Sequence, residues 1–289
     1  MYADYHVHCE YSDDSQTPIA DQVNRAIELG LSELCFTDHV DYGIKKDWSE
    51  GNIQYRSSDG INYDASQQEP LANVDYPKYF AALHDTKEQF RNQINIKQGL
   101  EFGIQTHTIK QYKTLYKTWQ EELDFVLLSM HQVNDKEFWT QEFQAGKTQQ
   151  EYNLEYYKEI FEVMKRFQNY SVLAHLDLIV RYDKNGRFPF EKTEDIIAEI
   201  LKLAIHDGKG IEINTSSWHY GLTDTQPSRE ILRLYKDLGG TILTTGSDAH
   251  KPEYLADHFT EAHQILRSIG FRKFCTFDHM EPIFHPLEG

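Results

Sequence analysis

Short segments rich in β-forming residues alternate with helix-like stretches along the chain, and this alternation limits the possible folds more than any other feature of the sequence. The β-rich segments cover residues 2–8, 31–39, 94–103, 124–131, 170–177, 210–216 and 240–250. The helix-like stretches cover residues 18–30, 77–92, 155–167, 194–208 and 228–240. Strands that alternate with helices in this way are typical of parallel βαβ units.

The 289 residues fit either one large α/β barrel or two ordinary domains, and length alone does not choose between them. No linker rich in Pro, Gly or Ser divides the chain. We therefore predict a single domain over residues 1–289, folded as one continuous α/β barrel of seven strands. Residues 40–76 and 132–149 form long loops, which in compact domains are usually lids, binding loops or disordered segments.

Every β-rich segment ends in polar residues, most of them of types that bind metal ions. These strand-end residues are His6, His8, Asp38, His39, Glu101, His131, His175, Asn214, Asp248 and His250. In a βα barrel the carboxyl ends of the strands converge on one face, where the active site lies. Residues far apart in the sequence would therefore meet around one small volume.

A purely structural role for these histidines has to be weighed, because the chain contains 14 histidines in all. His84, His206, His258 and His263 lie on helical segments, and we interpret them as ordinary surface or core residues. The imidazoles at successive strand ends are different, because burying them together without cations would be costly and would leave them poorly partnered. The pattern therefore favours a metal site.

The residue types and their spacing restrict the metal. His6 and His8 are two residues apart, so in a strand their side chains point to the same face and can hold one ion together. The three cysteines form no CxxC pair, which argues against a closed thiolate zinc site. Imidazole and carboxylate ligands suit Zn, Mn or Fe(II), and the candidates are too many for one ion. We expect two or three ions, with Glu101 placed to bridge two of them.

The formal net charge of −17 limits the partners, because it repels nucleic acid and anionic membrane surfaces on average. The first residues, MYADYHVHCE, do not have the pattern of a signal peptide, and no apolar run approaches the ~20 residues needed to cross a bilayer. We expect a cytoplasmic enzyme that acts on a small molecule, with no nucleic-acid or membrane partner.

The ordered set of strand-end motifs resembles the PHP (polymerase and histidinol phosphatase) superfamily. The motifs are DYHVH, FTDH, the histidines of SMH and AHLD, and GSDAH, and they extend from residue 4 to residue 250. The free-standing size and the segments LLSMH, AHLDLI and EINTS are most similar to the histidinol-phosphate phosphatase branch. The resemblance implies a distorted seven-stranded (β/α)7 TIM-like barrel with a centre of three divalent ions, which are Zn, Fe or Mn.

The resemblance also implies how the ligands divide among the three ions. The first ion would be held by His6, His8, Glu101 and Asp248. The second would be held by Glu101, His131 and His175, with Glu101 bridging, and the third by Asp14, His39 and His250. The family often has His where Asp14 stands, and the neighbouring Asp13 is the alternative ligand.

One departure from the family pattern concerns the phosphate contact. The loop after the sixth strand commonly reads N-T-[SA]-G-L-R in the family, but this chain reads NTSSWHYG, with His219 in the place of the arginine. Arg181 is the alternative cation for the phosphate, although a solvated loop position explains it equally well. We expect Arg181, His219 and Trp218 to contact the substrate.

The resemblance implies a metal-dependent phosphomonoester hydrolase, and its branch implies a histidinol-phosphatase that converts L-histidinol phosphate to L-histidinol and phosphate in histidine biosynthesis. In the implied mechanism a hydroxide that bridges two metal ions attacks phosphorus, so that no phosphoenzyme is needed. Glu101, Asp248 and His39 are the residues that we expect to be catalytic.

Three other interpretations stay open at this point. Another PHP phosphoesterase would act on a different small phosphomonoester or nucleotide, although the charge of −17 counts against a nuclease. An amidohydrolase-like metallohydrolase also begins with HxH, but that class commonly bridges its metals with a modified Lys at the fourth strand end, where this chain has His131. A catalytically inactive metal-binding module would be expected to have lost ligands, whereas this chain has the full set.

Overall fold

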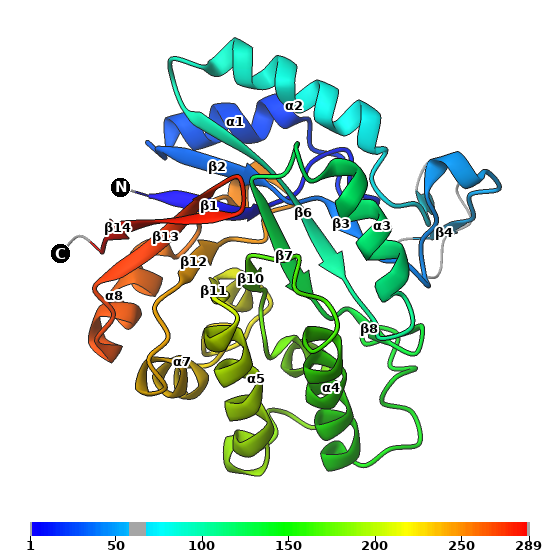
Figure 1. Ribbon diagram of the computed structural model, residues 1–289, viewed down its shortest axis with the longest axis vertical. Helices are drawn as coiled ribbons and strands as arrows, with labels where there is room; N and C mark the ends of the chain where they lie inside the picture. The colour runs from blue at the N-terminus through cyan, green and yellow to red at the C-terminus, as the bar shows by residue number, and fades with distance from the viewer. Residues whose placement is uncertain (1, 58–67, 288–289) are drawn as a thin grey trace.

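The computed structural model describes residues 2–57 and 68–287, and it confirms the α/β fold predicted from the sequence. Seven parallel strands form a nearly closed barrel that helices surround (Figure 1). In sheet order the strands are β1 (Ala3–Val7), β2 (Glu33–Phe36), β6 (Asn95–Gly103), β7 (Phe125–Ser129), β10 (Val172–Leu173), β11 (Gly210–Asn214) and β12 (Leu243–Gly246).

The first and last strands of the barrel meet, and this contact joins the two ends of the motif set. Val7 and Ala249 form an isolated parallel bridge. The amide of His8 donates to the carbonyl of Ala249 at 3.0 Å, and the amide of Asp248 donates to the carbonyl of His6 at 2.8 Å. The HxH motif and the GSDAH motif are therefore neighbours in space.

The described helices cover the outside of the barrel. They are α1 (Ile19–Glu28), α2 (Tyr76–Phe90), α3 (Ile109–Trp119), α4 (Gln149–Met164), α5 (Glu194–His206), the short α6 (Ser216–His219), α7 (Arg229–Asp237) and α8 (Phe259–Ile269). Single 3-10 turns cover Trp48–Glu50, Leu178–Tyr182, Phe190–Lys192 and Pro252–Tyr254. None of the helices in the described part of the chain is long and apolar enough to span a bilayer.

The structure corrects the predicted helices in two ways. It adds α3 and the short α6, which the sequence analysis did not give, and it sets the bounds of α8, where the sequence analysis already placed His263 on a helical segment. It also begins α4 at Gln149 rather than at residue 155, because Thr148 and Glu151 form a capping box in which each side chain bonds the other residue's backbone amide.

Short hairpins occupy the two long loops. The first loop carries β3 (His39–Val40), which pairs with β6, and the antiparallel pair β4 (Tyr55–Ser57) and β5 (Gln68–Pro70). The second loop carries the antiparallel pair β8 (Gln132–Val133) and β9 (Lys136–Glu137). Both loops follow strands whose carboxyl ends carry predicted metal ligands, so both are placed to shape the site.

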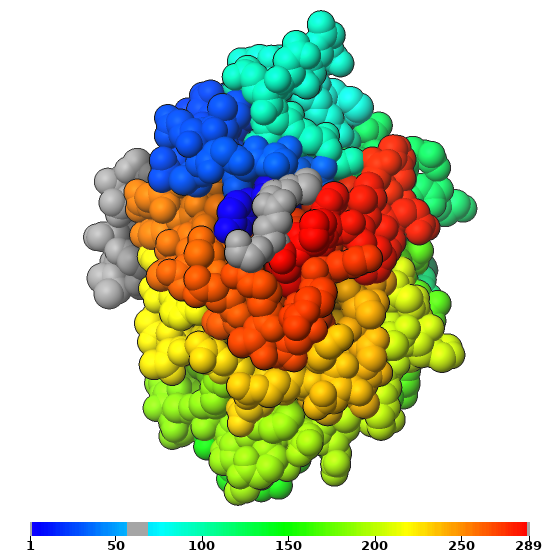
Figure 2. All heavy atoms as spheres, turned by 90° about the vertical axis from the view of Figure 1, so that its left-hand side faces the viewer, coloured from blue at the N-terminus to red at the C-terminus, as the bar shows by residue number. Residues whose placement is uncertain are grey.

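A C-terminal hairpin that the sequence analysis did not predict packs against the barrel. It consists of β13 (Lys273–Asp278) and β14 (Glu281–Pro286). The Tyr5 hydroxyl donates to the carbonyl of Phe277 at 3.0 Å, and the ring of Phe277 lies 5.0 Å from that of Phe125. Figure 2 shows this hairpin in red beside the blue N-terminal segments and the orange α8. Because Phe125 begins β7, the hairpin covers the end of the barrel away from the predicted ligands.

We expect Phe277→Ala to lower the free energy of unfolding by about 3–5 kcal/mol, because it removes a buried ring from an aromatic cluster. Urea denaturation measures the loss, and the metal content of the folded variant should stay unchanged. Ile283→Ala on the neighbouring strand is the control, because Ile283 is 45% exposed and its removal should cost about 0.5 kcal/mol or less. Equal effects of the two substitutions would mean that the hairpin does not belong to the core.

Candidate metal centre

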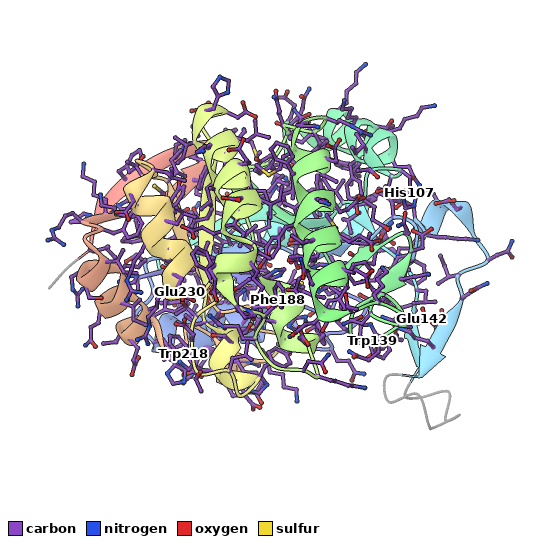
Figure 3. The ribbon with its side chains drawn as sticks, turned by 90° about the horizontal axis from the view of Figure 1, so that it is seen from below. His107, Trp139, Glu142, Phe188, Trp218 and Glu230 are labelled. Carbon is purple, nitrogen blue, oxygen red and sulfur yellow. The ribbon has the colours of Figure 1, made fainter. Side chains whose placement is uncertain are left out.

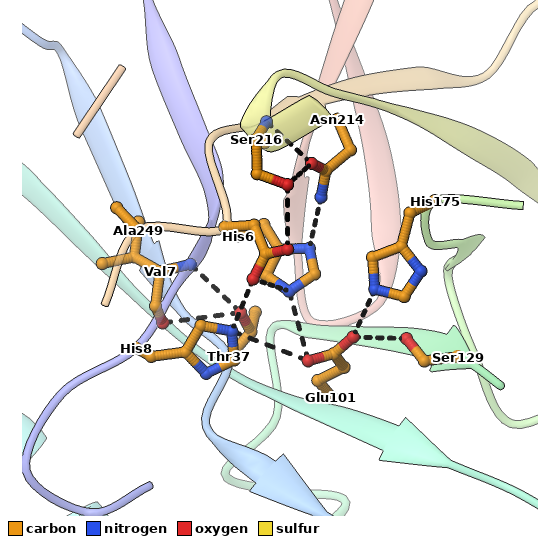
Figure 4. A network of polar contacts seen from close by, with 12 residues as sticks. His6, Val7, His8, Thr37, Glu101, Ser129, His175, Asn214, Ser216 and Ala249 are labelled. Atoms are coloured by element: carbon orange, nitrogen blue, oxygen red, sulfur yellow. Dashed lines mark hydrogen bonds and ion pairs between the residues drawn. The ribbon is translucent and has the colours of Figure 1, made fainter. Parts of the chain in front are cut away.

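The barrel strands bring all nine predicted ligands together at their carboxyl ends. Each predicted ligand has a nitrogen or oxygen within 4.0 Å of another ligand of the set. Figure 4 shows His6, His8, Glu101 and His175 turned toward one another, with His6 on β1, Glu101 on β6, and His8 and His175 just beyond the ends of β1 and β10. The convergence predicted from the strand-end pattern is therefore present in the structure.

Glu101 lies at the centre of this cluster and is completely buried. Its Oε1 lies 3.0 Å from His131 Nε2 and 2.9 Å from His175 Nε2. Its Oε2 lies 3.2 Å from His6 Nε2 and 3.0 Å from His39 Nδ1. The two oxygens thus face two different groups of imidazoles, which is the arrangement that a bridging carboxylate requires.

Asp248 completes the group that begins with the HxH motif. Its Oδ1 lies 3.6 Å from His6 Nε2 and 3.4 Å from His8 Nε2. His6, His8 and Asp248 each offer one ligand atom, and these atoms lie within 4.8 Å of one another. Because His6 lies on β1, His8 directly follows β1 and Asp248 follows β12, the contact between β1 and β12 assembles this group.

The structure places Asp14, rather than Asp13, beside the remaining histidines. Asp14 Oδ2 lies 3.2 Å from His250 Nε2 and 3.5 Å from His39 Nε2. Asp13 turns the other way and forms an ion pair with Lys45, its Oδ1 lying 2.6 Å from Nζ. The geometry therefore favours Asp14 over the alternative that the sequence left open.

The described ligands fall into overlapping groups rather than three separate ones. Four triplets have ligand atoms within 4.8 Å of one another: His6–His8–Asp248, His6–Glu101–His175, His39–Glu101–His131 and His8–His39–His250. The assignment of particular ligands to three ions therefore stays a prediction.

Unpartnered polar atoms test whether these residues fit metal ions. Six buried atoms of the cluster have no hydrogen-bond partner among the described residues, and these are His6 Nε2, His8 Nε2, His39 Nδ1, Glu101 Oε2, His175 Nδ1 and His250 Nε2. A buried polar atom without a partner costs free energy, and a cation would remove that cost for several of them at once. The residues fit divalent ions that accept nitrogen and oxygen ligands, such as Zn, Fe or Mn.

Burial and neighbouring charges shift the pKa values of the imidazoles in opposite directions. Some of the imidazoles are therefore neutral and others are protonated. Burial lowers the pKa of His8 well below its usual range, and it also lowers the pKa of His175, so both are neutral and free to coordinate. At His131 burial acts in the same direction, but the carboxylates of Asp41 and Glu101 outweigh it and raise the pKa to about 9. Metal ions would have to displace such protons.

A second layer of polar residues orients the ligands, and the sequence analysis missed most of it. Glu212 Oε1 lies 2.7 Å from His6 Nδ1, and Asp41 Oδ1 lies 2.8 Å from His131 Nδ1. The Ser129 hydroxyl donates to Glu101 Oε1 at 2.6 Å. Partners of this kind fix the tautomer and orientation of a ligating side chain. The sequence signal that could have revealed this layer was Glu212, a charged residue between two isoleucines of β11.

Two glycines make room for these orienting carboxylates. A Cβ atom on Gly246 would lie 2.1 Å from Glu212 Oε1 and 2.5 Å from His6 Cβ. A Cβ atom on Gly103 would lie 1.9 Å from Asp41 Oδ1. No side chain larger than hydrogen is therefore compatible with either contact.

Arg181 lies in the cavity beside the cluster, with its side chain only 7% exposed. Its guanidinium donates to Ser216 Oγ at 2.6 Å and to Gln226 Oε1 at 3.0 Å, and it lies 3.4 Å from Asp248 Oδ2. The solvated-loop alternative for Arg181 does not describe this position. A buried, oriented cation next to the ligands is what a phosphate contact requires.

The structure separates the other two residues that we expected to contact the substrate. His219 is exposed and stacks on Tyr254, with ring centroids 3.8 Å apart, in an adjoining pocket that shares Asp248 with the main cavity. Trp218 packs against His258 and lines neither pocket, and Figure 3 shows it well apart from Trp139. The expectation that Trp218 contacts the substrate stays a prediction.

The outer wall of the cavity comes from the two long loops. It includes Lys45 and Arg56 from the first loop and Glu137 and Trp139 from the second. The sequence analysis gave lids and binding loops among the usual roles of such long loops but did not single out these residues, because their positions depend on how the hairpins fold over the barrel.

Comparisons with known proteins agree with this geometry. The PHP domain family model matches residues 4–216. A histidinol-phosphatase from Lactococcus lactis is 30% identical over 285 residues, which cover 96% of this chain and 95% of that relative. A protein named "Probable histidinol-phosphatase" from Thermotoga maritima is 24% identical, over 93% of this chain and 92% of that relative.

A solved structure extends the likeness to three dimensions. The crystal structure of histidinol phosphate phosphatase from Lactococcus lactis, in complex with zinc, L-histidinol and phosphate, matches with a TM-score of 0.81 at 28% identity. The match covers 97% of this chain and 98% of the other. The likeness therefore includes the whole barrel and the C-terminal segment.

We expect Glu212→Gln to weaken metal binding by about 10- to 100-fold, because it leaves His6 without the carboxylate that orients it. Titration of metal-free protein with Zn²⁺ measures the change. Glu33→Gln is the matched control, because Glu33 is also a buried strand glutamate but contacts Tyr5 and Asn95 instead of a predicted ligand. A loss of affinity in both variants would trace the effect to general destabilisation.

Metal binding should release protons and strengthen as pH rises. In the metal-free protein the pKa of His131 is about 9, and neighbouring carboxylates also raise the pKa values of His6 and His39 against the effect of burial. These imidazoles are protonated at neutral pH and must lose protons to coordinate, so Zn²⁺ affinity should increase between about pH 6 and pH 9. Calorimetry in buffers with different ionisation heats measures the release, and a heat independent of the buffer would contradict it.

Proposed function

The chain belongs to the PHP domain family, and on that basis we propose that it is a histidinol-phosphatase, a metal-dependent enzyme that hydrolyses L-histidinol phosphate to L-histidinol and phosphate. The buried cluster of imidazoles and carboxylates around Glu101 is the observation that supports metal-dependent hydrolysis. The nearly full-length likeness to a histidinol-phosphatase supports the choice of substrate.

We propose that the cluster holds three divalent ions. The ligands would be His6, His8, Glu101 and Asp248 for the first ion, Glu101, His131 and His175 for the second, and Asp14, His39 and His250 for the third. When bound, such ions lower the pKa of coordinated water and neutralise charge on the phosphoryl oxygens. Zinc in the Lactococcus lactis structure makes zinc one reasonable occupant, alongside Fe and Mn.

Glu101, Asp248 and His39 are the residues that we propose to be catalytic through these contacts. Burial acts to raise the pKa of Glu101, but the imidazoles of His6, His131 and His39 outweigh it and hold the pKa well below its usual range. Glu101 is therefore ionised and presents both oxygens to the cluster. His39 faces Glu101 with Nδ1 and Asp14 with Nε2, so it connects the centre of the cluster to its exposed rim.

Arg181 is the proposed phosphate contact. Its guanidinium is held by Ser216 and Gln226, so it can orient a phosphoryl oxygen without first being ordered. His219, in the adjoining pocket, remains the second candidate, because it shares a boundary with the ligands at Asp248.

The proposal also covers the domain organisation, the partner and the location of the protein. A single catalytic domain would span residues 1–289, since the C-terminal hairpin packs on the barrel. The partner would be a small phosphomonoester rather than nucleic acid, in keeping with the charge of −17. A cytoplasmic location in histidine biosynthesis completes the proposal.

The proposed function predicts the order of preference in a substrate panel. Metal-loaded protein should release phosphate from L-histidinol phosphate with a kcat/KM at least about 100-fold above that for nucleoside monophosphates, as expected for a site that binds one small substrate through several polar contacts. Phosphate release is measured together with the metal content of the same preparation. Glu101→Gln should lose metal and turnover together, and a preference for nucleotides in the wild-type protein would favour the alternative PHP phosphoesterase.

Arg181→Ala should lower kcat/KM for L-histidinol phosphate by about 10- to 100-fold, mainly through KM, because it removes charged hydrogen bonds to phosphate. His219→Ala is the comparison and should raise KM less, because His219 is exposed in the adjoining pocket. Metal content is measured in both variants, since Arg181 also contacts Asp248. The reverse order of effects, with metal retained, would assign the phosphate contact to His219.

A further inference from the structure

A buried lysine pairs with two carboxylates at the edge of the metal cluster, and the proposed chemistry does not use it. Lys45 lies in the first long loop, and its side chain is only 6% exposed. Its Nζ lies 2.6 Å from Asp13 Oδ1 and 2.9 Å from Asp41 Oδ2. Lys45 and Asp41 line the cavity, whereas Asp13 does not. The ammonium group therefore lies between Asp13 and a carboxylate of the cavity wall.

Contacts on the side of the cluster fix the position of Lys45. Its backbone amide donates to the carbonyl of Asp41 at 2.8 Å. Asp41 is itself held in place, because its Oδ1 lies 2.8 Å from His131 Nδ1 and its amide donates to Asn73 Oδ1 at 2.9 Å. These contacts fix the ammonium group that pairs with Asp41, so Asp13 is the partner whose position the ammonium group sets.

Asp13 and Asp14 are otherwise similar candidates for a metal ligand. They are the two central residues of a turn in which the amide of Ser15 donates to the carbonyl of Ser12 at 3.3 Å. Both carboxylates offer the oxygen donors that divalent ions accept. Asp14 faces the imidazoles of the proposed third site, whereas Asp13 faces Lys45. The cation is therefore a difference between the surroundings of two neighbouring residues of one type.

The buried position of Asp13 makes its carboxylate dependent on this cation. The side chain of Asp13 is 1% exposed, and its Oδ2 has no hydrogen-bond partner among the described residues. A buried carboxylate that loses a charged partner carries an uncompensated charge, which costs free energy until another cation compensates it. The proposed metal ions, bound by the next residue in the chain, would supply that compensation.

We propose that Lys45 is a positioning residue that selects Asp14 as the metal ligand by holding Asp13 away from the ions. This inference rests on the proposed function, in which Asp14 is a ligand of the third ion. Lys45 acts through Asp13 in this role and not by contact with the substrate. The alternative is that the turn alone orients both aspartates and that Lys45 only joins the loop to the barrel.

Zn²⁺ binding by the two single aspartate variants is the first measurement. With Lys45 present, Asp14→Asn should weaken Zn²⁺ binding by about 100-fold or more, because even the loss of a group that only orients a ligand costs about 10- to 100-fold. Asp13→Asn should change the affinity by about twofold or less, as expected where no contact with an ion is lost. Titration of metal-free protein gives the affinity and the number of ions bound per chain. Equal losses in the two variants would overturn the proposal.

Removal of the cation tests whether Lys45 makes this choice. In the Asp14→Asn/Lys45→Met variant Asp13 is released and should replace Asp14, so this variant should bind Zn²⁺ about 10-fold more tightly than Asp14→Asn alone. Adding Asp13→Asn should abolish the gain, and Lys45→Arg, which keeps the charge, should not produce it. Lys45→Met in the presence of Asp14 should change the affinity much less. An equal gain with and without Asp14 would assign the effect to the lost charge, and no gain would leave the turn in control, so either result overturns the proposal.

Lys97→Met is the matched control for loss of a buried lysine. Lys97 near the start of β6 is also buried and also pairs with two carboxylates, Asp124 and Asp278, at the end of the barrel away from the predicted ligands. Lys97→Met should not restore Zn²⁺ binding to Asp14→Asn, and a gain there would trace the effect to a loosened barrel and overturn the proposal. Circular dichroism checks folding, and Lys45→Gln, which keeps a hydrogen-bond donor, replaces Lys45→Met if the latter does not fold.

The outcomes also distinguish this inference from the proposed function. If the metal-loaded wild-type protein does not hydrolyse L-histidinol phosphate but Asp13 replaces Asp14 as predicted, the proposed function fails and the role of Lys45 stands. If the protein hydrolyses L-histidinol phosphate and Lys45→Met restores no Zn²⁺ binding to Asp14→Asn, the role of Lys45 is wrong and the proposed function stands.

Discussion

The site depends on one buried carboxylate that faces imidazoles on both sides. Glu101 is completely buried, and its two oxygens lie within 3.2 Å of nitrogens from His6, His39, His131 and His175. These residues come from four separate parts of the barrel, so one carboxylate contacts side chains from all four. Desolvation would penalise such a cluster if it held no cations, and the unpartnered atoms around Glu101 show where that penalty concentrates. Stability and metal binding are therefore coupled at one residue.

The polar residues behind the predicted ligands fix how those ligands are oriented. Glu212 and Asp41 each face the outer nitrogen of a histidine, and each needs a glycine opposite it, because a Cβ on Gly246 or Gly103 would overlap the carboxylate. The inner face of the barrel is thus fitted to polar side chains at one end and to aromatic rings at the other. The same strands serve both ends, which explains why a single continuous barrel contains the whole site.

The sequence predicted which polar side chains converge better than it predicted what surrounds them. Strand ends of a parallel barrel converge by geometry, and the two-residue period aligns His6 with His8, so local patterns were enough. The contact between Arg56 and Glu137 depends on how two inserted hairpins fold toward each other, and no local pattern encodes it. The packing of Trp218 depends on tertiary structure in a similar way, because its neighbour in the sequence, His219, reaches a pocket while the indole packs on His258. Helix α3 and the C-terminal hairpin were also missed.

The meeting of the first and last strands has a consequence for how the protein matures. Asp248 and His250 reach His6 and His8 only when β12 docks beside β1, some 240 residues later in synthesis. A ribosome-bound chain that has not yet extended past this point presents an incomplete set of donors, whatever its earlier strands have formed. The full set of predicted ligands is therefore available only after β12 has docked beside β1, so a chain that ends before β12 would hold fewer of the proposed ions.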